Sequence, residues 1–304
     1  MKKVLIAGGT GLIGSRLSSL LTAGGYEVAH LSRKIGGNPK YPTYHWDPMK
    51  GLIDQDIVSQ VDYVINLAGA GIADARWTSA RKQLIIDSRV RGNDLLLSAF
   101  QELAKPPSAF ISGAAIGFYG DRGEQEVTEE DGPGMGFLSE SCVAWEKSIE
   151  QIRNKTNIRT VVIRIGLVLS TQGGALEKML LPLHAFTSTY FGNGQQWYSW
   201  IHLDDICRQF IFAIEQEKME GIYNGVAPNP ARNKTIAKVL PRAKGVSAAV
   251  VPAPRLALRL AMGEMADAVL TGTKVSAAKI QEAGFQFEHP DLEAALKHLI
   301  SNNL

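Results

Sequence analysis

The sequence predicts an α/β fold in which a doubly wound parallel sheet is followed by a smaller, mostly helical C-terminal lobe. Three observations lead to this prediction. Short β-branched runs alternate with longer amphipathic stretches over the first 170 residues, a glycine-rich turn follows the first apolar run, and the alternation stops beyond Ser170. Alternating strand and helix patterns are typical of βαβ units wound around a parallel sheet.

The elements follow one another in a regular order. Residues 4–7 are expected to form the first strand, residues 12–21 the first helix, because their leucines recur at helical spacing, and residues 27–32 the second strand. The remaining expected elements are strands at 61–67, 109–112 and 160–169 and helices at 84–103 and 137–152. These give a sheet of at least five parallel strands.

The lobe boundary follows from the same pattern. We expect a dinucleotide-binding domain over residues 1–170, with 200–226 as a candidate segment to return to it, and a substrate lobe over 171–304. The tail beyond residue 250 is expected to be mostly helical. Prolines and charged residues interrupt its apolar run, so no stretch stays apolar over the roughly 18 residues that a membrane-spanning helix needs.

Composition narrows the classes of function. Apolar residues make up 45% and charged residues 20% of the 304, as in ordinary globular proteins. A net charge of +2 argues against nucleic acid or an anionic membrane as partner and leaves a small molecule. Cys142 and Cys207, the two cysteines, match neither a disulfide framework nor a zinc spacing, so we expect a cytoplasmic protein.

The segment AGGTGLIG carries the first functional signal. Gly8, Gly11 and Gly14 would allow a tight turn, a close approach to a pyrophosphate and close packing of the helix on the strand. The helix N-terminus would then face the anion, and Thr10 adds a hydroxyl. The spacing is G-x-x-G-x-x-G, which differs from the common dinucleotide pattern. The alternative is a turn needed only for packing.

The end of the second strand bears on the choice of cofactor. NAD-binding proteins usually place an acidic residue here, whereas this chain has Ser32, Arg33 and Lys34. A guanidinium can grip a 2′-phosphate through two hydrogen bonds, so NADP is favoured over NAD. The alternative is that these cations are ordinary solvated loop residues.

Several spaced motifs resemble one known superfamily. GGTGLIG, NLAG at 66–69, FYG at 118–120 and WIHLDD at 200–205 together resemble the extended short-chain dehydrogenases/reductases, whose sheet is a Rossmann fold. Segments 67–77, 88–90, 173–182 and 263–287 are similar to its atypical branch, the epimerase family proteins of the NAD-dependent epimerase/dehydratase-like, or YfcH-like, group. The resemblance covers nearly the whole chain.

The resemblance implies a set of cofactor-binding residues. Arg89 is among them, with the alternative that it pairs with a surface acid such as Asp87. The implied set is Gly8, Thr10, Gly11, Leu12, Ile13 and Gly14 at the pyrophosphate, Ser32 and Arg33 at the 2′-phosphate, Leu67, Ala68 and Gly69 beside the adenosine, and Arg89, Arg164 and Leu169.

The chain departs from the superfamily at the catalytic dyad. The YxxxK tyrosine and lysine would fall on Leu138 and Cys142, and neither can replace them; the atypical branch is known for this lack. Tyr119 is the first candidate for acid/base chemistry and Ser112 the second, with a packed, structural Tyr119 as the alternative. Cys142 is expected to be a buried, inert thiol.

Other residues are candidates for the substrate. Arg76 and Trp77 would grip and stack on a phosphate-bearing substrate, and Trp200 would line the same cleft, with core or interface packing as the competing account. His202, Asp204 and Asp205 suggest a triad-like cluster, although Asp204 and Asp205 are favoured as the residues that cap and start a helix running to residue 214. No metal is expected.

Two functional hypotheses remain. The first is an NADP-binding oxidoreductase or epimerase acting on a small polar, sugar-nucleotide-like substrate without the YxxxK dyad. The second is a non-catalytic NADP-binding redox sensor or scaffold. Because relatives commonly form helix-mediated dimers, a homodimer is one expected assembly.

Overall fold

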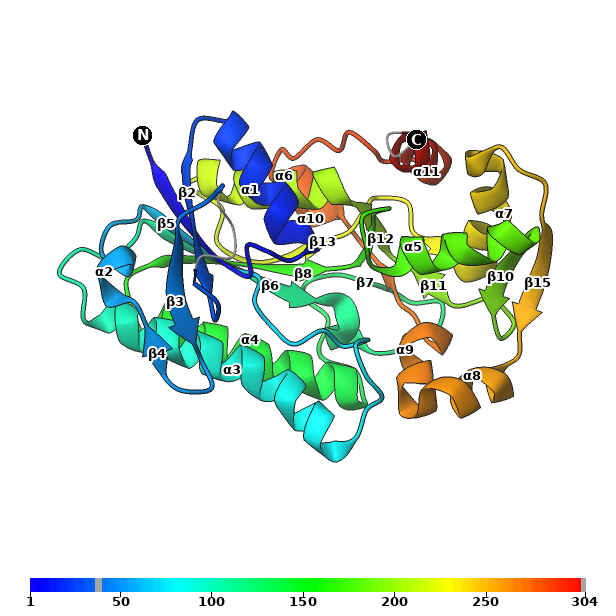
Figure 1. Ribbon diagram of the computed structural model, residues 1–304, viewed down its shortest axis with the longest axis horizontal. Coiled ribbons are helices and arrows are strands. Elements are labelled where there is room, and N and C mark those ends of the chain that lie inside the picture. The colour runs from blue at the N-terminus through cyan, green and yellow to red at the C-terminus, as the bar shows by residue number, and fades with distance from the viewer. Residues whose placement is uncertain (36–39, 302–304) are drawn as a thin grey trace.

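The computed structural model describes residues 1–35 and 40–301 and centres on one large sheet. It has eight strands in the order β13-β8-β6-β5-β1-β2-β3-β4 (Figure 1). Every neighbouring pair is parallel except β3 with β4. The predicted fold class is confirmed. The strands are β1 Lys3–Ala7, β2 Glu27–Ser32, β3 Thr43–Asp47, β4 Leu52–Ile53, β5 Tyr63–Asn66, β6 Ala109–Ala115, β8 Arg159–Ile165 and β13 Gly221–Gly225.

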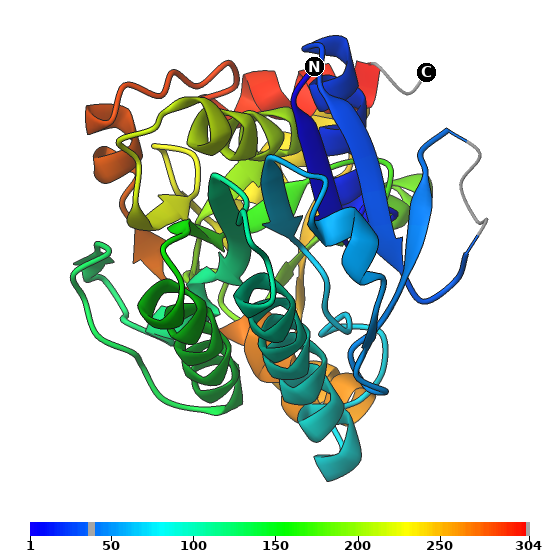
Figure 2. The ribbon, with the colours of Figure 1, turned by 90° about the vertical axis from the view of Figure 1, so that its left-hand side faces the viewer.

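Each central strand contributes to two cores. In β1, Val4 and Ile6 belong to one apolar cluster and Leu5 and Ala7 to the other, as the two-residue period of a strand requires. Helices α1 (Leu12–Ala23) and α6 (Leu203–Glu215) cover the first face, and α3 (Ser79–Gln101) and α4 (Phe137–Lys155) cover the second (Figure 2). Burial on both faces explains the nearly continuous apolar runs of the strands.

The region expected as one strand at 160–169 is two strands, which corrects that prediction. β8 ends at Ile165, and β9 (Leu167–Leu169) pairs with β12 (Trp200–His202) in a separate small sheet. Gly166 lies at the break, where a Cβ would come within 2.3 Å of the Ser199 carbonyl oxygen. The chain therefore turns from the large sheet into the C-terminal part at this point. Strands β3 and β4 were not expected from the sequence.

The C-terminal part has its own apolar core, which includes Leu176, Trp200 and Leu296. Segment 203–225 leaves this region, because α6 packs on α1 and β13 pairs with β8. The other elements are α2 Gln55–Val58, β7 Glu126–Val127, α5 Ala175–Leu180, β10 Thr187–Phe191, β11 Trp197–Tyr198, β14 Ala231–Arg232, α7 Asn233–Lys244, β15 Ala249–Ala253, α8 Arg255–Met262, α9 Asp267–Leu270, β16 Lys274–Val275, α10 Ala278–Glu282 and α11 Leu292–Ser301, with 3-10 turns at Ile116–Tyr119, Leu181–Ala185 and Gly263–Ala266.

Among the described residues, none of the helices combines the length and the apolar character that crossing a membrane requires.

Candidate functional site

The glycine turn packs backbone against backbone at the carboxyl end of β1. Gly8 has φ +82°, and a Cβ there would lie 2.8 Å from the carbonyl carbon of Leu67. A Cβ on Gly14 would lie 2.2 Å from the Gly8 carbonyl oxygen. The turn is closed by the Gly11 N–H, which donates to the Gly8 carbonyl at 3.0 Å. These two glycines are therefore needed for close packing of β1, α1 and the loop after β5.

The N-terminus of α1 is open. Gly11 is its N-cap residue, no side chain caps the helix, and its first turn contains no acidic residue. Thr10 and Gly11 are exposed. The first N–H groups of a helix have no partner within it, so this end presents backbone donors and a partial positive charge to an anion. Gly11 has no Cβ to hold a phosphate away. The cradle therefore fits a dinucleotide pyrophosphate.

The predicted 2′-phosphate residues lie on the neighbouring strand. Ser32 ends β2, which pairs with β1, and its Oγ accepts a hydrogen bond from the Lys34 N–H at 3.2 Å. The Arg33 side chain is exposed, and no described carboxylate forms an ion pair with it. The end of β2 thus carries cations beside the glycine turn, as a 2′-phosphate would need.

Arg89 projects from α3 to the loop after β5. A Cβ on Gly69 would lie 2.9 Å from the Arg89 Cζ. Nη1 donates to the carbonyl oxygens of Ala70 at 3.0 Å and Ile85 at 2.9 Å, and the guanidinium lies 4.8 Å from the centre of the Trp145 ring. Burial lowers the pKa of Arg89 from its ordinary value. The suggested pairing with Asp87 is not formed.

A buried polar chain holds the same loop. Asn66 donates through Nδ2 to the Asn93 Oδ1 at 2.8 Å, and Asn93 donates to the Ser148 Oγ at 2.8 Å. The Asn66 Oδ1 accepts from the Ala68 N–H at 3.0 Å. The loop is thereby tied to α3 and α4. Asn93 was not predicted from the sequence, although an asparagine at helical spacing from Leu97 and Phe100 is a signal of a buried polar contact.

Tyr119 is fully buried, with its hydroxyl engaged on both sides. It donates to the Asn224 Oδ1 at 2.7 Å and accepts from the Arg164 Nη1 at 2.8 Å. Burial raises the pKa of Tyr119 to about 12. Arg164 uses its other nitrogens in a fork with Glu146, both contacts at 2.8 Å. This closed network favours the structural alternative for Tyr119 and leaves Arg164 few donors for a cofactor.

The place of the superfamily dyad is apolar. A Cβ on Gly117 would lie 3.5 Å from the Leu138 Cβ and 3.6 Å from the Cys142 Sγ. Cys142 is buried, and this burial raises the pKa of its thiol to about 12, as expected for an inert cysteine. Ser112 is also buried, and its Oγ donates to the Gly113 carbonyl at 3.0 Å.

The side chains of the three predicted substrate residues are engaged in contacts within the protein. Arg76 donates to the Leu260 carbonyl at 2.9 Å and to the next carbonyl at the end of α8, and so joins the loop after β5 to the C-terminal part. Trp77 donates to the Ile72 carbonyl at 2.8 Å. Trp200 is fully buried and donates to the Asn229 carbonyl at 2.8 Å, and Leu169 lies in the same core. The geometry favours the packing alternative for Trp77 and Trp200. Arg76 is exposed, but its guanidinium is engaged by backbone carbonyls, and Leu169, which was expected at the cofactor, is a core residue.

His202 belongs to a group of three imidazoles that the sequence analysis missed. Its ring stacks on His289 at 3.8 Å, and its Nε2 lies 3.1 Å from the Nδ1 of His298. The spacing of these nitrogens would suit a metal ion. However, the His202 Nδ1 accepts the Asp204 N–H at 2.9 Å and caps α6, so the proton of the neutral ring stands on Nε2, where a metal would bind. Asp204 and Asp205, which were expected to cap this helix, lie in its first turn instead, and the cap is His202.

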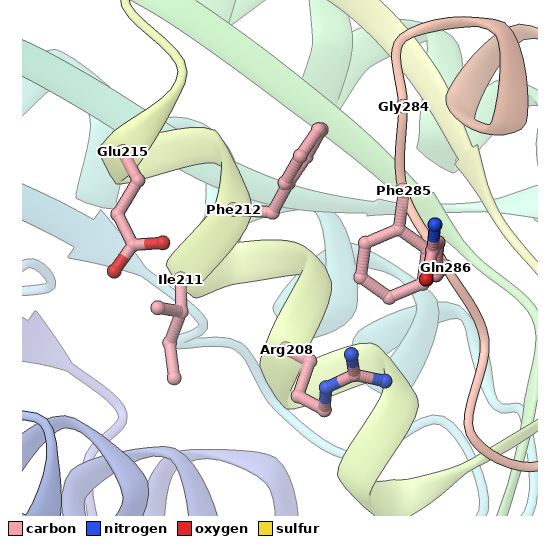
Figure 3. A pocket seen from close by; sticks show the side chains of 7 residues that line it. All are labelled: Arg208, Ile211, Phe212, Glu215, Gly284, Phe285 and Gln286. Atoms are coloured by element: carbon pink, nitrogen blue, oxygen red, sulfur yellow. The ribbon is translucent and has the colours of Figure 1, made fainter.

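A pocket lies beside α6 and is lined by none of the residues described above. Figure 3 shows it between the outer side of α6 and the segment that follows α10. Its lining side chains include Arg208, Phe212 and Phe285, none of which the sequence analysis singled out. None of its lining residues belongs to the glycine turn.

The family models and the most similar relatives point to the same protein family. The model of the NAD dependent epimerase/dehydratase family matches residues 4–224, and a domain of unknown function, DUF1731, matches residues 253–299. Epimerase family proteins of Staphylococcus aureus (strain MRSA252) and Mycobacterium bovis are 36% and 35% identical to the chain. The first alignment covers 99% of this chain and 100% of the relative, and the second 96% of each.

Solved structures agree. The human epimerase family protein SDR39U1, crystallised with NADPH, is 32% identical with a TM-score of 0.89 over 99% of both chains. A nucleoside-diphosphate sugar epimerase from Corynebacterium glutamicum is 30% identical with a TM-score of 0.80, over 99% of this chain and 58% of that one. The chain therefore belongs to the NAD-dependent epimerase/dehydratase family, in its group of epimerase family proteins.

Proposed function

We propose that this chain is an NADP-binding oxidoreductase or epimerase of the extended short-chain dehydrogenase type that acts on a small polar, sugar-nucleotide-like substrate. The observation that carries the proposal is the open N-terminus of α1 behind a glycine turn closed by Gly8 and Gly14. The N–H groups of Leu12 and Ile13 would hold the pyrophosphate. Bound NADP would supply a hydride acceptor, or in reduced form a donor.

The choice of NADP rests on the end of β2. Arg33 is exposed beside the glycine turn with no described carboxylate to neutralise it, and Ser32 offers a hydroxyl. A guanidinium binds phosphate through two charge-assisted hydrogen bonds, whereas the ribose hydroxyl of NAD gives it no charge to bind. The crystal structure of the human relative with NADPH supports the same choice.

The substrate class rests on the family alone. A relative that is 30% identical is named a nucleoside-diphosphate sugar epimerase, which supports a sugar-nucleotide-like substrate. A second candidate, an NADP-binding redox sensor or scaffold without turnover, is favoured by one observation. Leu138 and Cys142 stand where proton transfer would be expected. Leu138 has no titratable group, and burial raises the pKa of the Cys142 thiol to about 12, so neither residue can exchange a proton with a substrate near neutral pH.

Calorimetric titration with NADPH and with NADH tests the proposed cofactor. We expect NADPH to bind more tightly than NADH. Arg33→Gln should weaken the affinity for NADPH by only about tenfold, because the lost contact between Arg33 and the 2′-phosphate is exposed to solvent. The affinity for NADH, which lacks this phosphate, should not change. Lys50→Gln is the control, since Lys50 is an exposed cation that pairs with Asp47 outside the site. Equal affinities for the two cofactors, or equal losses in the two variants, would contradict NADP selection.

Turnover separates the two candidates. Oxidation of NADPH with a panel of keto sugars, and interconversion of nucleoside-diphosphate sugars, would support the enzyme. Tight NADPH binding with no reaction on any member of either panel would favour the sensor.

A further inference from the structure

Two polar connections join the sheet domain to the end of α8. Arg76, in the loop after β5, donates through Nε and Nη2 to the Ala261 carbonyl at 3.1 and 2.7 Å, and through Nη2 to the Leu260 carbonyl at 2.9 Å. Lys82, near the start of α3, pairs with Glu264, just beyond α8. The last turn of a helix presents carbonyls without partners and a partial negative charge. Each connection therefore sets a cation of the sheet domain against a negative group of the C-terminal part.

Segment 254–265, which contains α8, packs only lightly on the rest of the chain. None of the residues of α8 is buried, and two of its leucines are exposed. Before the segment, β15 is anchored by its pairing with β10, and after it the side chain of Ala266 is fully buried. A helix with few buried apolar contacts lies at the low end of local stability. Segment 254–265 can therefore move while both of its ends stay fixed.

The two connections cross the crevice in which the cofactor is proposed to lie. A dinucleotide in a doubly wound sheet lies at the carboxyl ends of the strands, where the strand order reverses. Here the reversal falls between β1 and β5. The loop after β5 borders this crevice, since a Cβ on Gly8 would lie 2.8 Å from the carbonyl carbon of Leu67. The same loop carries Arg76, so its contact with α8 joins the two sides of the crevice.

The C-terminal part also meets the sheet domain on the other side of the glycine turn. Gly173 and Gly174 precede α5, and a Cβ on them would lie 3.8 and 3.5 Å from the methyl carbons of Leu12. Leu12 begins α1, whose N-terminus is the proposed pyrophosphate site. This second contact is firmly anchored, because Leu176 of α5 is fully buried. A dinucleotide between the two contacts would enter and leave where the sheet domain meets α8.

We propose that segment 254–265 is a lid over the crevice, that Arg76 and Lys82 form its latch, and that opening of the latch sets the rate at which the cofactor enters and leaves. The inference rests on the proposed function. The latch suits this role because its links to Glu264 and to the α8 carbonyls are polar and exposed, and exposed links of this kind are individually weak. Lid opening commonly limits the release of ligands from enzymes.

The test measures the rate constants of NADPH association and dissociation by stopped-flow fluorescence in the full chain. Arg76→Gln removes the charge that holds the two carbonyls. Lys82→Glu and Glu264→Lys each break the ion pair, and the double variant restores it with the charges exchanged. Hydrogen exchange of the amides in the lid reports on its opening directly, and thermal unfolding of each variant reports on the fold.

Arg91→Gln is the matched control. Arg91 is a cation of the same helix α3, and its half-exposed side chain pairs with Asp87 on that helix. This variant removes the same charge from the same element without touching the latch. Its rate constants for NADPH and the amide exchange of its lid should therefore equal those of the wild type.

We expect Arg76→Gln to raise both rate constants by about tenfold, as the loss of one charge-assisted hydrogen bond from the closed state implies. Their ratio, the dissociation constant, should change much less, because a lid that is closed without ligand hinders entry and exit alike. Each single charge reversal should speed NADPH dissociation and amide exchange in the lid. The double variant should return both toward the wild type.

Three results would overturn the inference and leave the proposed function intact. They are rate constants in Arg76→Gln equal to those in Arg91→Gln, a double variant that releases NADPH as fast as the single variants do, and a loss of thermal stability without faster exchange of NADPH. A wild-type chain that does not bind NADPH would overturn the proposed function itself, and the lid with it.

Discussion

Gly11→Ala separates binding at the glycine turn from folding. Gly11 has φ −76°, which alanine adopts without strain, and the nearest atom to a new Cβ would be the Gly8 carbonyl oxygen at 3.3 Å. Loss of glycine at an N-cap costs about 1 kcal/mol, and the smaller entropy of the unfolded chain returns about 0.4–1 kcal/mol. We therefore expect the free energy of unfolding to change by less than about 1 kcal/mol.

The effect on NADPH should be much larger. The new methyl group would project from the exposed N-terminus of α1, where the pyrophosphate is proposed to contact the backbone. Displacing one charge-assisted hydrogen bond costs about 1.5–3 kcal/mol, which corresponds to a roughly 10- to 150-fold weaker affinity. Calorimetric titration with NADPH and urea unfolding, performed on the same preparations, measure the two quantities separately.

Two further variants serve as controls. Gly24→Ala lies at the opposite end of α1 with φ −78°, where the nearest contact of a Cβ would be an ordinary 3.4 Å, so neither quantity should change much. Gly14→Ala would force a Cβ to 2.2 Å from the Gly8 carbonyl oxygen, and should lower stability instead. Unchanged NADPH affinity in a folded Gly11→Ala chain would refute the reasoning.

Three other results follow from the buried groups. Tyr119→Phe should lower the free energy of unfolding, measured in urea, by about 2–4 kcal/mol, because Arg164 and Asn224 each lose a buried partner. The affinity for NADPH should stay the same. A variant that is as stable as the wild type but has lost activity would favour a catalytic role for Tyr119 instead. Cys142 should resist alkylation at pH 8 until the chain unfolds, because its pKa is raised to about 12, and rapid native labelling would contradict this burial. Burial lowers the pKa of His202 to about 3, so below about pH 6.5 the unfolded chain binds a proton that the folded chain does not. The free energy of unfolding should therefore be about 2 kcal/mol lower at pH 5 than above pH 6.5. In His202→Asn, the free energy of unfolding should fall less steeply as the pH is lowered.

Local sequence signals located the central strands of the sheet and the glycine turn, but not the edge strands β3 and β4. Each of the first strands is a short apolar run, and the helices between them carry apolar residues at helical spacing, so hydrophobic period alone located β1, α1 and β2. The break at Gly166 could not be found in this way. It depends on the distant Ser199 backbone, and the run 160–169 remains apolar on both sides of it.

The residues of the glycine turn could be predicted from the sequence more fully than the candidate catalytic and substrate residues, for a related reason. The Gly8 turn is a local backbone motif, so its geometry can be inferred from eight consecutive letters. Roles for Tyr119 and Arg76 depended on which distant groups they would meet. Asn224 and the carbonyls at the end of α8 are more than a hundred residues away in the sequence, and nothing in the local pattern announced them.

A crystal structure of this chain grown with NADPH tests the central claim most directly. We predict pyrophosphate oxygens within hydrogen-bond distance of the Leu12 and Ile13 N–H groups, with the 2′-phosphate at the guanidinium of Arg33. NADPH bound away from the end of β1, or a cofactor whose pyrophosphate makes no contact with the first turn of α1, would contradict the account.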